Sequence, residues 1–171
     1  MAKEIKGIVV PVVTPFHADE SINESALRKI VNYLVDNGVH GLFPSGSQGE
    51  LFALSTDEKK RVMDVVIEEN NGRAFVMPST GAVTTRESIE LTKHAEKSGA
   101  DAVSVITPYF ISPSADELRD HYIRISESVS RFDGFGHPTE LEHQSRDRAP
   151  PRVEFDAPGR TSDRRSSAIH A

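Results

Sequence analysis

GIVVPVV, from Gly7 to Val13, is the first of four apolar runs that alternate with amphipathic segments along this chain. A continuous apolar run of this length is typical of a strand in a parallel sheet, which is buried on both faces. Pro11 has no N–H to donate and therefore favours an edge or a bulge within the run. From about Glu24 the apolar residues follow helical spacing instead, so the first unit is predicted to be a strand followed by a helix.

The same unit recurs three more times. The next apolar runs begin near positions 39, 74 and 102, a spacing of about 30 residues that suits successive strand–helix units. Each amphipathic segment begins with a residue that can cap a helix or with a capping box. These start signals are Asn23 and the tetrapeptides 55–58, 84–87 and 114–117, and the helices are predicted to end near Gly38, Gly72 and Gly99.

Strands that alternate with helices predict an α/β fold with a parallel sheet. Two architectures fit this pattern, a doubly wound open sheet and a (β/α)₈ barrel, and periodicity alone does not separate them. Both architectures place ligands at the C-terminal ends of the strands. The loops that follow the four strands are therefore the candidate functional segments under either architecture.

Composition limits the class of protein. The chain has 171 residues, enough for one domain but fewer than the roughly 250 residues of a typical complete barrel. Its formal net charge of −6 argues against a nucleic acid partner. It contains no cysteine, and no stretch approaches the ~20 apolar residues of a membrane span, so we expect a cytoplasmic location and no membrane partner.

The composition changes near Ser130. All lysines of the chain lie before this residue, whereas residues 131–171 contain seven arginines and no lysine. This segment has too few branched aliphatic residues to offset the entropy lost on ordering. We therefore divide the chain into a partial barrel over residues 1–130 and a disordered, unrelated tail over residues 131–171, produced by a frameshift or a fusion. A genuine linker or interaction tail is the alternative.

The second of the four loops is the most informative. It contains Gly46, Ser47, Gln48 and Gly49, and its glycines are expected to adopt positive φ and to let the backbone approach a ligand. Successive N–H groups in such a turn form a binding site for a carboxylate or phosphate. Glu50 is expected to anchor the loop by accepting hydrogen bonds. A glycine-rich turn that binds no ligand is the alternative.

The other loops contain fewer candidate residues. Tyr109 directly follows the fourth strand and is the candidate acid–base residue, with a packing role as the alternative. Ser79 and Thr80 can donate hydrogen bonds to a ligand or cap their own loop. Asp120 and His121 are predicted to lie on a solvated helix face. No metal site is expected, because no two histidines lie four residues apart with an acidic residue between them. The histidines considered are His17, His40, His94 and His121.

Several of these motifs occur together in one order and spacing, namely GIVVPVVTPF at 7–16, GSQGE at 46–50, Gly81, and VITPY at 105–109. In this combination the chain resembles the dihydrodipicolinate synthase and N-acetylneuraminate lyase family over about residues 4–130. The resemblance implies a (β/α)₈ TIM barrel, of which the first four units are present. It also implies a homo-oligomeric enzyme that makes or breaks a carbon–carbon bond through a lysine Schiff base with pyruvate or another 2-oxo acid, without a cofactor.

The resemblance also assigns roles to individual residues. The turn Gly46–Gly49 corresponds to the part of the family site that binds the substrate carboxylate, through Ser47 and Gln48, and Tyr109 belongs to its catalytic aromatic pair. Most members have threonine in place of Gln48, and the synthases often have a second tyrosine in place of Phe110. Both hydroxyls are missing here, which favours a lyase or 2-oxo acid aldolase over 4-hydroxy-tetrahydrodipicolinate synthase.

The Schiff-base lysine of the family lies on a later strand, beyond Ser130, where this sequence has no match. An amine that forms an imine must be neutral, and therefore desolvated among the strand ends. We expect a truncated member that is inactive alone and is homo-oligomeric or prone to aggregate through its open sheet edges. The alternatives are a non-catalytic oligomerising or carboxylate-binding half barrel and an open-sheet module that binds a small anion. Every lysine precedes the first strand or falls in a predicted helix: Lys3, Lys6, Lys29, Lys59, Lys60, Lys93 and Lys97.

Overall fold

The computed structural model of the chain describes residues 5–130 and residue 132. The predictions made for the segment 131–171 lie outside these residues, except at that single position. Within the described part, strands and helices alternate along the chain until the fourth unit, as the sequence predicts.

The three described strands form a parallel sheet in the order β1-β2-β3, with β1 at Val9–Pro11, β2 at Gly41–Phe43 and β3 at Phe75–Val76. Val9 is opposite Gly41, and Gly41 is in turn opposite Phe75, so these residues share one face of the sheet. Pro11 lies in β1, which is an edge strand of the described sheet, as its missing N–H predicts.

The prediction of a fourth strand over residues 102–106 is wrong for the described chain, because the segment makes a single parallel bridge, between Ser79 and Ser104. The N–H of Val76 donates to the carboxylate of Asp101 at 2.9 Å, where a continuous ladder would supply a backbone carbonyl. The segment still lies beside β3, because the N–H of Ser104 donates to the carbonyl of Pro78 at 2.9 Å. The fourth unit therefore keeps its place in the sheet without forming a regular strand.

The helices begin where local side chains can satisfy their first N–H groups, and their bounds are Glu24–Asp36 for α1, Thr56–Asn70 for α2, Thr85–Ser98 for α3 and Ala115–Ser126 for α4. Asn23 caps α1, and complete capping boxes begin α2 at Ser55 and α4 at Ser114. At α3 only half of the predicted box forms. Thr84 accepts from the Glu87 N–H, but the Glu87 carboxylate is bound by Lys59 of α2 at 3.0 Å.

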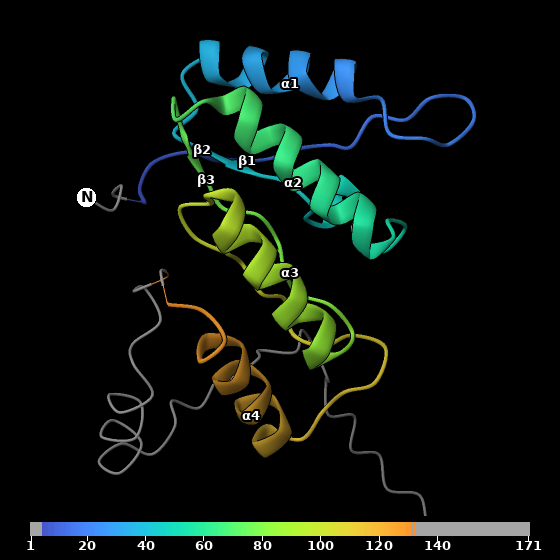
Figure 1. Cartoon of the computed structure of the whole chain (residues 1–171), viewed down its shortest axis with the longest axis vertical. Coiled ribbons are helices and arrows are strands. Elements are labelled where there is room, and N and C mark those ends of the chain that lie inside the picture. Colours follow the sequence, from blue (N-terminus) through green and yellow to red (C-terminus); the bar gives the residue numbers. More distant parts are fainter. Residues whose placement is uncertain (1–4, 131, 133–171) are drawn as a thin grey trace, which may run out of the picture.

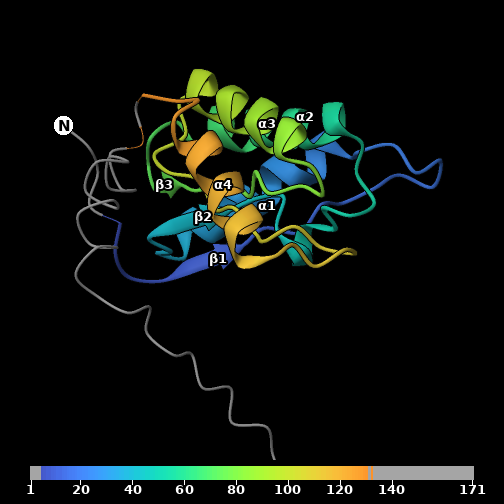
Figure 2. The same ribbon diagram turned by 90° about the horizontal axis from the view of Figure 1, so that it is seen from below.

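The helices pack side by side in chain order and lie on one face of the sheet (Figures 1 and 2). The main core joins α1 and α2 to the strands, and a second cluster lies around α3. Burial of these side chains holds the helices against the sheet, and because its strands are parallel, their C-terminal ends lie at one edge. The core includes Val12, Leu27, Val31, Leu42, Val62, Val65, Val66 and Val76, and the second cluster includes Met63, Leu91, Ala95 and Val103.

Candidate functional site

The candidate site lies at the C-terminal edge of the sheet, where the loop after each strand reaches the same side of the molecule, on the right in Figure 1. The loops after β1 and β2 are in direct contact, because Oγ1 of Thr14 donates to the carbonyl of Gly49, the last residue of η1, a short 3₁₀ helix at Ser47–Gly49. The structure therefore brings the predicted carboxylate-binding turn to the rim of the partial barrel.

The turn after β2 has two unused N–H groups. The Gly49 N–H donates to Gly46 at 3.0 Å, and the Glu50 N–H donates to Ser47 at 3.1 Å. Within the described residues, the N–H groups of Ser47 and Gln48 donate to no other group, as is usual in the first turn of a helix. Both side chains are exposed. This arrangement can accept a small anion such as a carboxylate.

The prediction of positive φ at the two glycines of this turn is wrong. Neither Gly46 nor Gly49 has positive φ, whereas the flanking Ser45 and Glu50 do, at 57° and 58°. A Cβ on Gly46 would lie 2.8 Å from the ring of Phe43, and one on Gly49 would lie 2.9 Å from the Val12 carbonyl. The glycines are required because the turn packs closely against Phe43 of β2 and against Val12, which follows β1.

Thr14 holds the turn against the end of the first strand. Its side chain is buried, and its Oγ1 donates to the Gly49 carbonyl at 2.8 Å. The sequence predicts this role for Glu50 instead, but within the described residues the Glu50 carboxylate accepts no hydrogen bond, and only its backbone contacts the turn. The expectation for Glu50 is wrong because its left-handed backbone leaves the residue exposed.

Substitution of Thr14 by valine is expected to loosen this turn. The change keeps the shape of the side chain but leaves the buried Gly49 carbonyl without its donor, which typically costs about 1–3 kcal/mol. Hydrogen exchange should show faster exchange of the Gly49 and Glu50 amides than of those in α1. Exchange at the turn that matches the wild type would show that Thr14 does not hold it. Thr56→Val, at a partly buried hydrogen bond between α2 and α3 that lies outside the turn, is the control.

Ser45 is a site residue that the sequence does not single out. It is 1% exposed, and its Oγ has no hydrogen-bond partner within the described residues. Its left-handed backbone is unfavourable for serine, and such strain is concentrated at functional sites. No pattern in the sequence identifies Ser45, because both features depend on how the strand end packs.

The third loop is joined to the rest of the fold by the hydroxyl of Thr80 and the backbone of Ser79. Thr80 is fully buried, and its Oγ1 accepts from Thr92 of α3 at 2.9 Å. The backbone N–H of Ser79 donates to Pro44 at 2.9 Å, which joins the third loop to the end of β2. Thr80 thus joins its loop to α3, a contact that the sequence does not predict.

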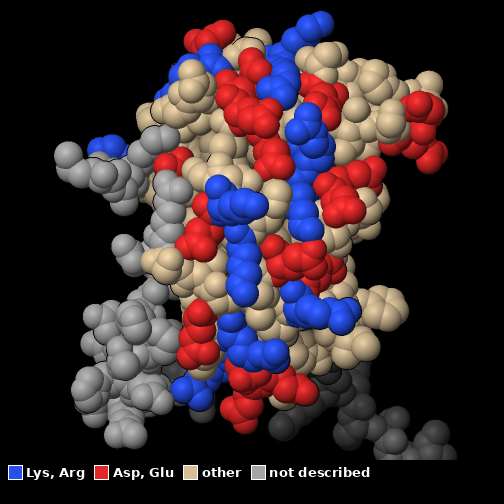
Figure 3. All heavy atoms as spheres, viewed as in Figure 1, with Lys and Arg blue, Asp and Glu red and all other residues tan. Residues whose placement is uncertain are grey.

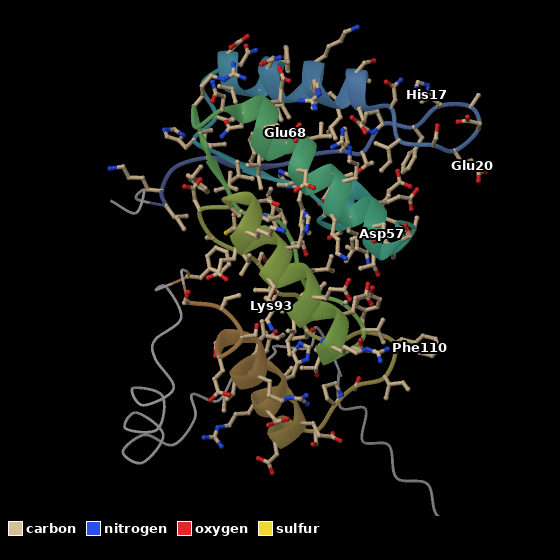
Figure 4. The ribbon with its side chains drawn as sticks, in the orientation of Figure 1. His17, Glu20, Asp57, Glu68, Lys93 and Phe110 are labelled. Atoms are coloured by element: carbon tan, nitrogen blue, oxygen red, sulfur yellow. The ribbon has the colours of Figure 1, made fainter. Side chains whose placement is uncertain are left out.

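Tyr109 and Phe110 lie on the loop after the fourth unit. Tyr109 is half-buried, whereas Phe110 is 97% exposed, has a φ of 79° and points away from the molecule (Figure 4). The third unit separates this loop from the Ser47 turn, so Tyr109 and Ser47 share one edge of the sheet without being neighbours in it.

The described lysines lie away from the strand ends, apart from Lys6, which precedes β1. Those placed in helices are Lys29 in α1, Lys59 and Lys60 in α2, and Lys93 and Lys97 in α3. Lys59 is the most deeply buried, and its amine donates to Glu87 at 3.0 Å in an ion pair between α2 and α3. The amine of Lys59 is thus engaged in holding two helices together.

The outer face of the helices carries interleaved charges of both signs (Figure 3). Arg28 bridges α1 to Glu68 of α2 at 2.8 Å, and Arg61 pairs with Glu24 at 2.6 Å, which lowers the pKa of the Glu24 carboxyl. This surface has no single-sign basic patch of the kind that binds nucleic acid. The described part of the chain has no group of three or more metal-ligating side chains, and none of its helices has both the length and the apolar character needed to cross a membrane.

Comparison with known proteins matches residues 4–131 to the dihydrodipicolinate synthetase family. A 4-hydroxy-tetrahydrodipicolinate synthase of Brucella abortus is 44% identical over 126 residues, which cover 74% of this chain and 43% of the relative. The structure of CdNal from Clostridium difficile in complex with mannosamine gives a TM-score of 0.74 at 35% identity, covering 75% of this chain and 45% of that one. A chloride-inhibited dihydrodipicolinate synthase of Acinetobacter baumannii, complexed with pyruvate, gives a TM-score of 0.72 at 37% identity, over 74% and 44% of the two chains. This chain therefore spans less than half of the length of these relatives.

Proposed function

This chain belongs to the dihydrodipicolinate synthetase family, and from that premise we propose that its turn Gly46–Gly49 binds the carboxylate of a 2-oxo acid in a carbon–carbon lyase or synthase. The main support for this proposal is that the backbone N–H groups of Ser47 and Gln48, at the C-terminal edge of the sheet, donate to no other described group. A relative with the same fold was solved in complex with pyruvate, a small 2-oxo acid, which supports this class of ligand.

The turn is suited to recognise a carboxylate. Two adjacent N–H groups can each donate to one carboxylate oxygen, and the Ser47 hydroxyl can add a third donor. Thr14 and the close packing of Gly49 against Val12 hold these groups in place before a ligand arrives. Tyr109, on the same edge of the sheet, is proposed as the acid–base residue of the site.

Two activities are candidates for a complete enzyme of this class, and neither is proposed for this chain alone, because the chain is proposed to form no imine. The lyase or 2-oxo acid aldolase is favoured because Gln48 and Phe110 lack the hydroxyls that the resemblance leads one to expect in a synthase. The 4-hydroxy-tetrahydrodipicolinate synthase is the second candidate, and it is supported by the name of the 44% identical relative.

We further propose that residues 1–130 form the family unit and that residues 131–171 do not extend it. This division is supported by the family match, which ends at residue 131, and by the change of composition at Ser130. A cytoplasmic location and self-association through the open edges of the sheet are part of the same proposal.

The binding proposal is tested by titrating the ¹⁵N-labelled chain with pyruvate at pH 7.5. The expected result is a saturable shift of the Ser47 and Gln48 amide resonances, and a much weaker response to pyruvamide, which has no carboxylate. Ser47→Ala should weaken binding less than tenfold because both backbone donors remain, and Ser25→Ala on α1 should not change it. A folded chain whose Ser47 and Gln48 resonances do not respond to pyruvate would contradict the proposal.

Carboxylate binding does not require imine formation, and we propose that this chain forms no imine with pyruvate. Lys59 is ion-paired, and the described lysines lie in helices or before β1, so none is a desolvated amine among the strand ends. Treatment with pyruvate and borohydride should leave the mass of the intact chain unchanged. A stable reduced adduct, mapped to one lysine by peptide sequencing, would show that the chain holds a competent amine.

A further inference from the structure

His121 is buried in the contact between α4 and α3, although the sequence predicts a solvated position for it. The side chain is 3% exposed, and its Nδ1 lies 2.9 Å from Oγ1 of Thr85, the first residue of α3. The ring also meets the edge of Tyr122, with the two centroids 5.3 Å apart. His121 therefore joins the first turn of α3 to the middle of α4.

The second ring nitrogen of His121 is buried without a partner. Its Nε2 has no hydrogen bond within the described residues. A neutral imidazole tolerates burial of Nε2, because Nδ1 can carry the proton and donate it to Thr85, so that Nε2 has only a lone pair and no N–H. A protonated ring carries an N–H on both nitrogens, so protonation would bury a charged donor without an acceptor.

The charges around the ring do not offset this penalty. On α4, the cationic Arg124 acts on His121, and together with burial, which is the larger cause, it lowers the pKa of the imidazole. The adjacent acidic residue is Asp120, whose Oδ2 lies 3.9 Å from Nη1 of Arg124 and forms an ion pair with it. On α3, His121 contacts Thr85, which is uncharged. The nearby carboxylate of Glu87 is already paired with the amine of Lys59 of α2. The groups that face His121 thus favour its neutral form.

Tyr122 connects the same helix to the loop that carries Tyr109. Its hydroxyl donates to the Val105 carbonyl at 3.2 Å, and burial raises the pKa of this phenol. Val105 precedes Tyr109 by four residues. Helix α4 is therefore attached to α3 through His121 and to the Tyr109 segment through Tyr122.

We propose that His121 and Tyr122 form an acid-sensitive latch, in which protonation of His121 releases α4 from α3 and frees the segment 105–110 that carries Tyr109. The link to activity rests on the proposed role of Tyr109, whereas the release of α4 does not. The unfolded chain binds a proton at His121 near pH ~6.5, the ordinary histidine value, and the folded chain binds it only at lower pH. The attachment of α4 is therefore constant above pH ~6.5 and weakens as pH falls below it.

The latch is tested by hydrogen exchange of the full chain at pH 7.5 and 5.5, with rates corrected for the intrinsic effect of pH. We expect α4 and residues 105–110 to lose protection at pH 5.5, by up to about tenfold, which is the limit for one histidine of unfolded pKa ~6.5, while α1 and α2 lose less. His121→Gln should remove this difference because glutamine does not titrate. His17→Gln, in an exposed loop that Figure 4 places far from α4, should behave like the wild type.

Equal protection of α4 at the two pH values, or the same acid loss in His121→Gln, would overturn the latch. If His121→Gln does not fold, the titration of the His121 ring resonances in the wild-type chain decides instead. A pKa below 6.5 supports the latch, and a pKa at or above it overturns the latch. The pyruvate titration at pH 7.5 is independent, so acid release of α4 without pyruvate binding would reject the proposed function and keep the latch.

Discussion

Replacement of Leu42 by alanine is expected to destabilise the chain by about 2–5 kcal/mol, the range for removing a fully buried leucine side chain. Leu42 is 0% exposed and lies in β2, between β1 and β3, where it contacts the main core. The cavity left by alanine would lie between the sheet and the helices and could close only by moving one of them. Urea denaturation followed by far-ultraviolet circular dichroism measures the change.

The control for Leu42→Ala is Tyr33→Ala, in α1, which removes a larger side chain that is 68% exposed. Because little of its apolar surface is buried, the free energy of unfolding should change by about 0.5 kcal/mol or less. Equal losses for the two variants would mean that the packing of helices on β2 is not what stabilises the chain.

Gly81→Ala is expected to displace the fourth unit and to cost about 1–3 kcal/mol, as overpacking of a filled site does. A Cβ at this position would lie 2.5 Å from the backbone nitrogen and 2.8 Å from the carbonyl oxygen of Ile106. Backbone atoms cannot rotate away, so the segment that leads to Tyr109 must shift. Hydrogen exchange should become faster at Thr80 and Ser104, whose backbone groups join the third and fourth units.

Gly38→Ala is the matched control for Gly81→Ala. A Cβ at Gly38 would have no atom within 4 Å, but the backbone has a φ of +82°. The variant should cost about 1 kcal/mol through backbone strain alone and leave exchange at Thr80 and Ser104 unchanged. If Gly81→Ala instead keeps wild-type exchange at these amides, the close contact with Ile106 does not position the fourth unit.

The helices could be predicted almost completely from the sequence. Asn23, Ser55 and Ser114 each cap a helix through a bond to a residue three positions ahead, so the whole interaction is contained in a short peptide. The start of α3 shows the limit of this reasoning. Glu87 has a stronger partner in Lys59, which lies 28 residues away in the chain, and the capping box is left half-formed.

The candidate site could be predicted only in part. The position of the Gly46–Gly49 turn follows from the order of strands and loops, since parallel strands end at one edge. The contacts within the site do not follow from that order. Thr14 rather than Glu50 holds the turn, and Ser45 is buried with a strained backbone.

The sequence by itself determined the order of strands and helices, the helix starts and the family, because capping, periodicity and motif spacing are properties of short segments. Only the tertiary structure decided that the fourth segment makes a single bridge in place of a regular strand, that Gly46 and Gly49 are required by close packing, and that His121 is buried. Each of these features depends on two segments that are distant in the chain and meet in the fold. The free energy of such contacts comes from burial and distance, which the order of residues does not contain.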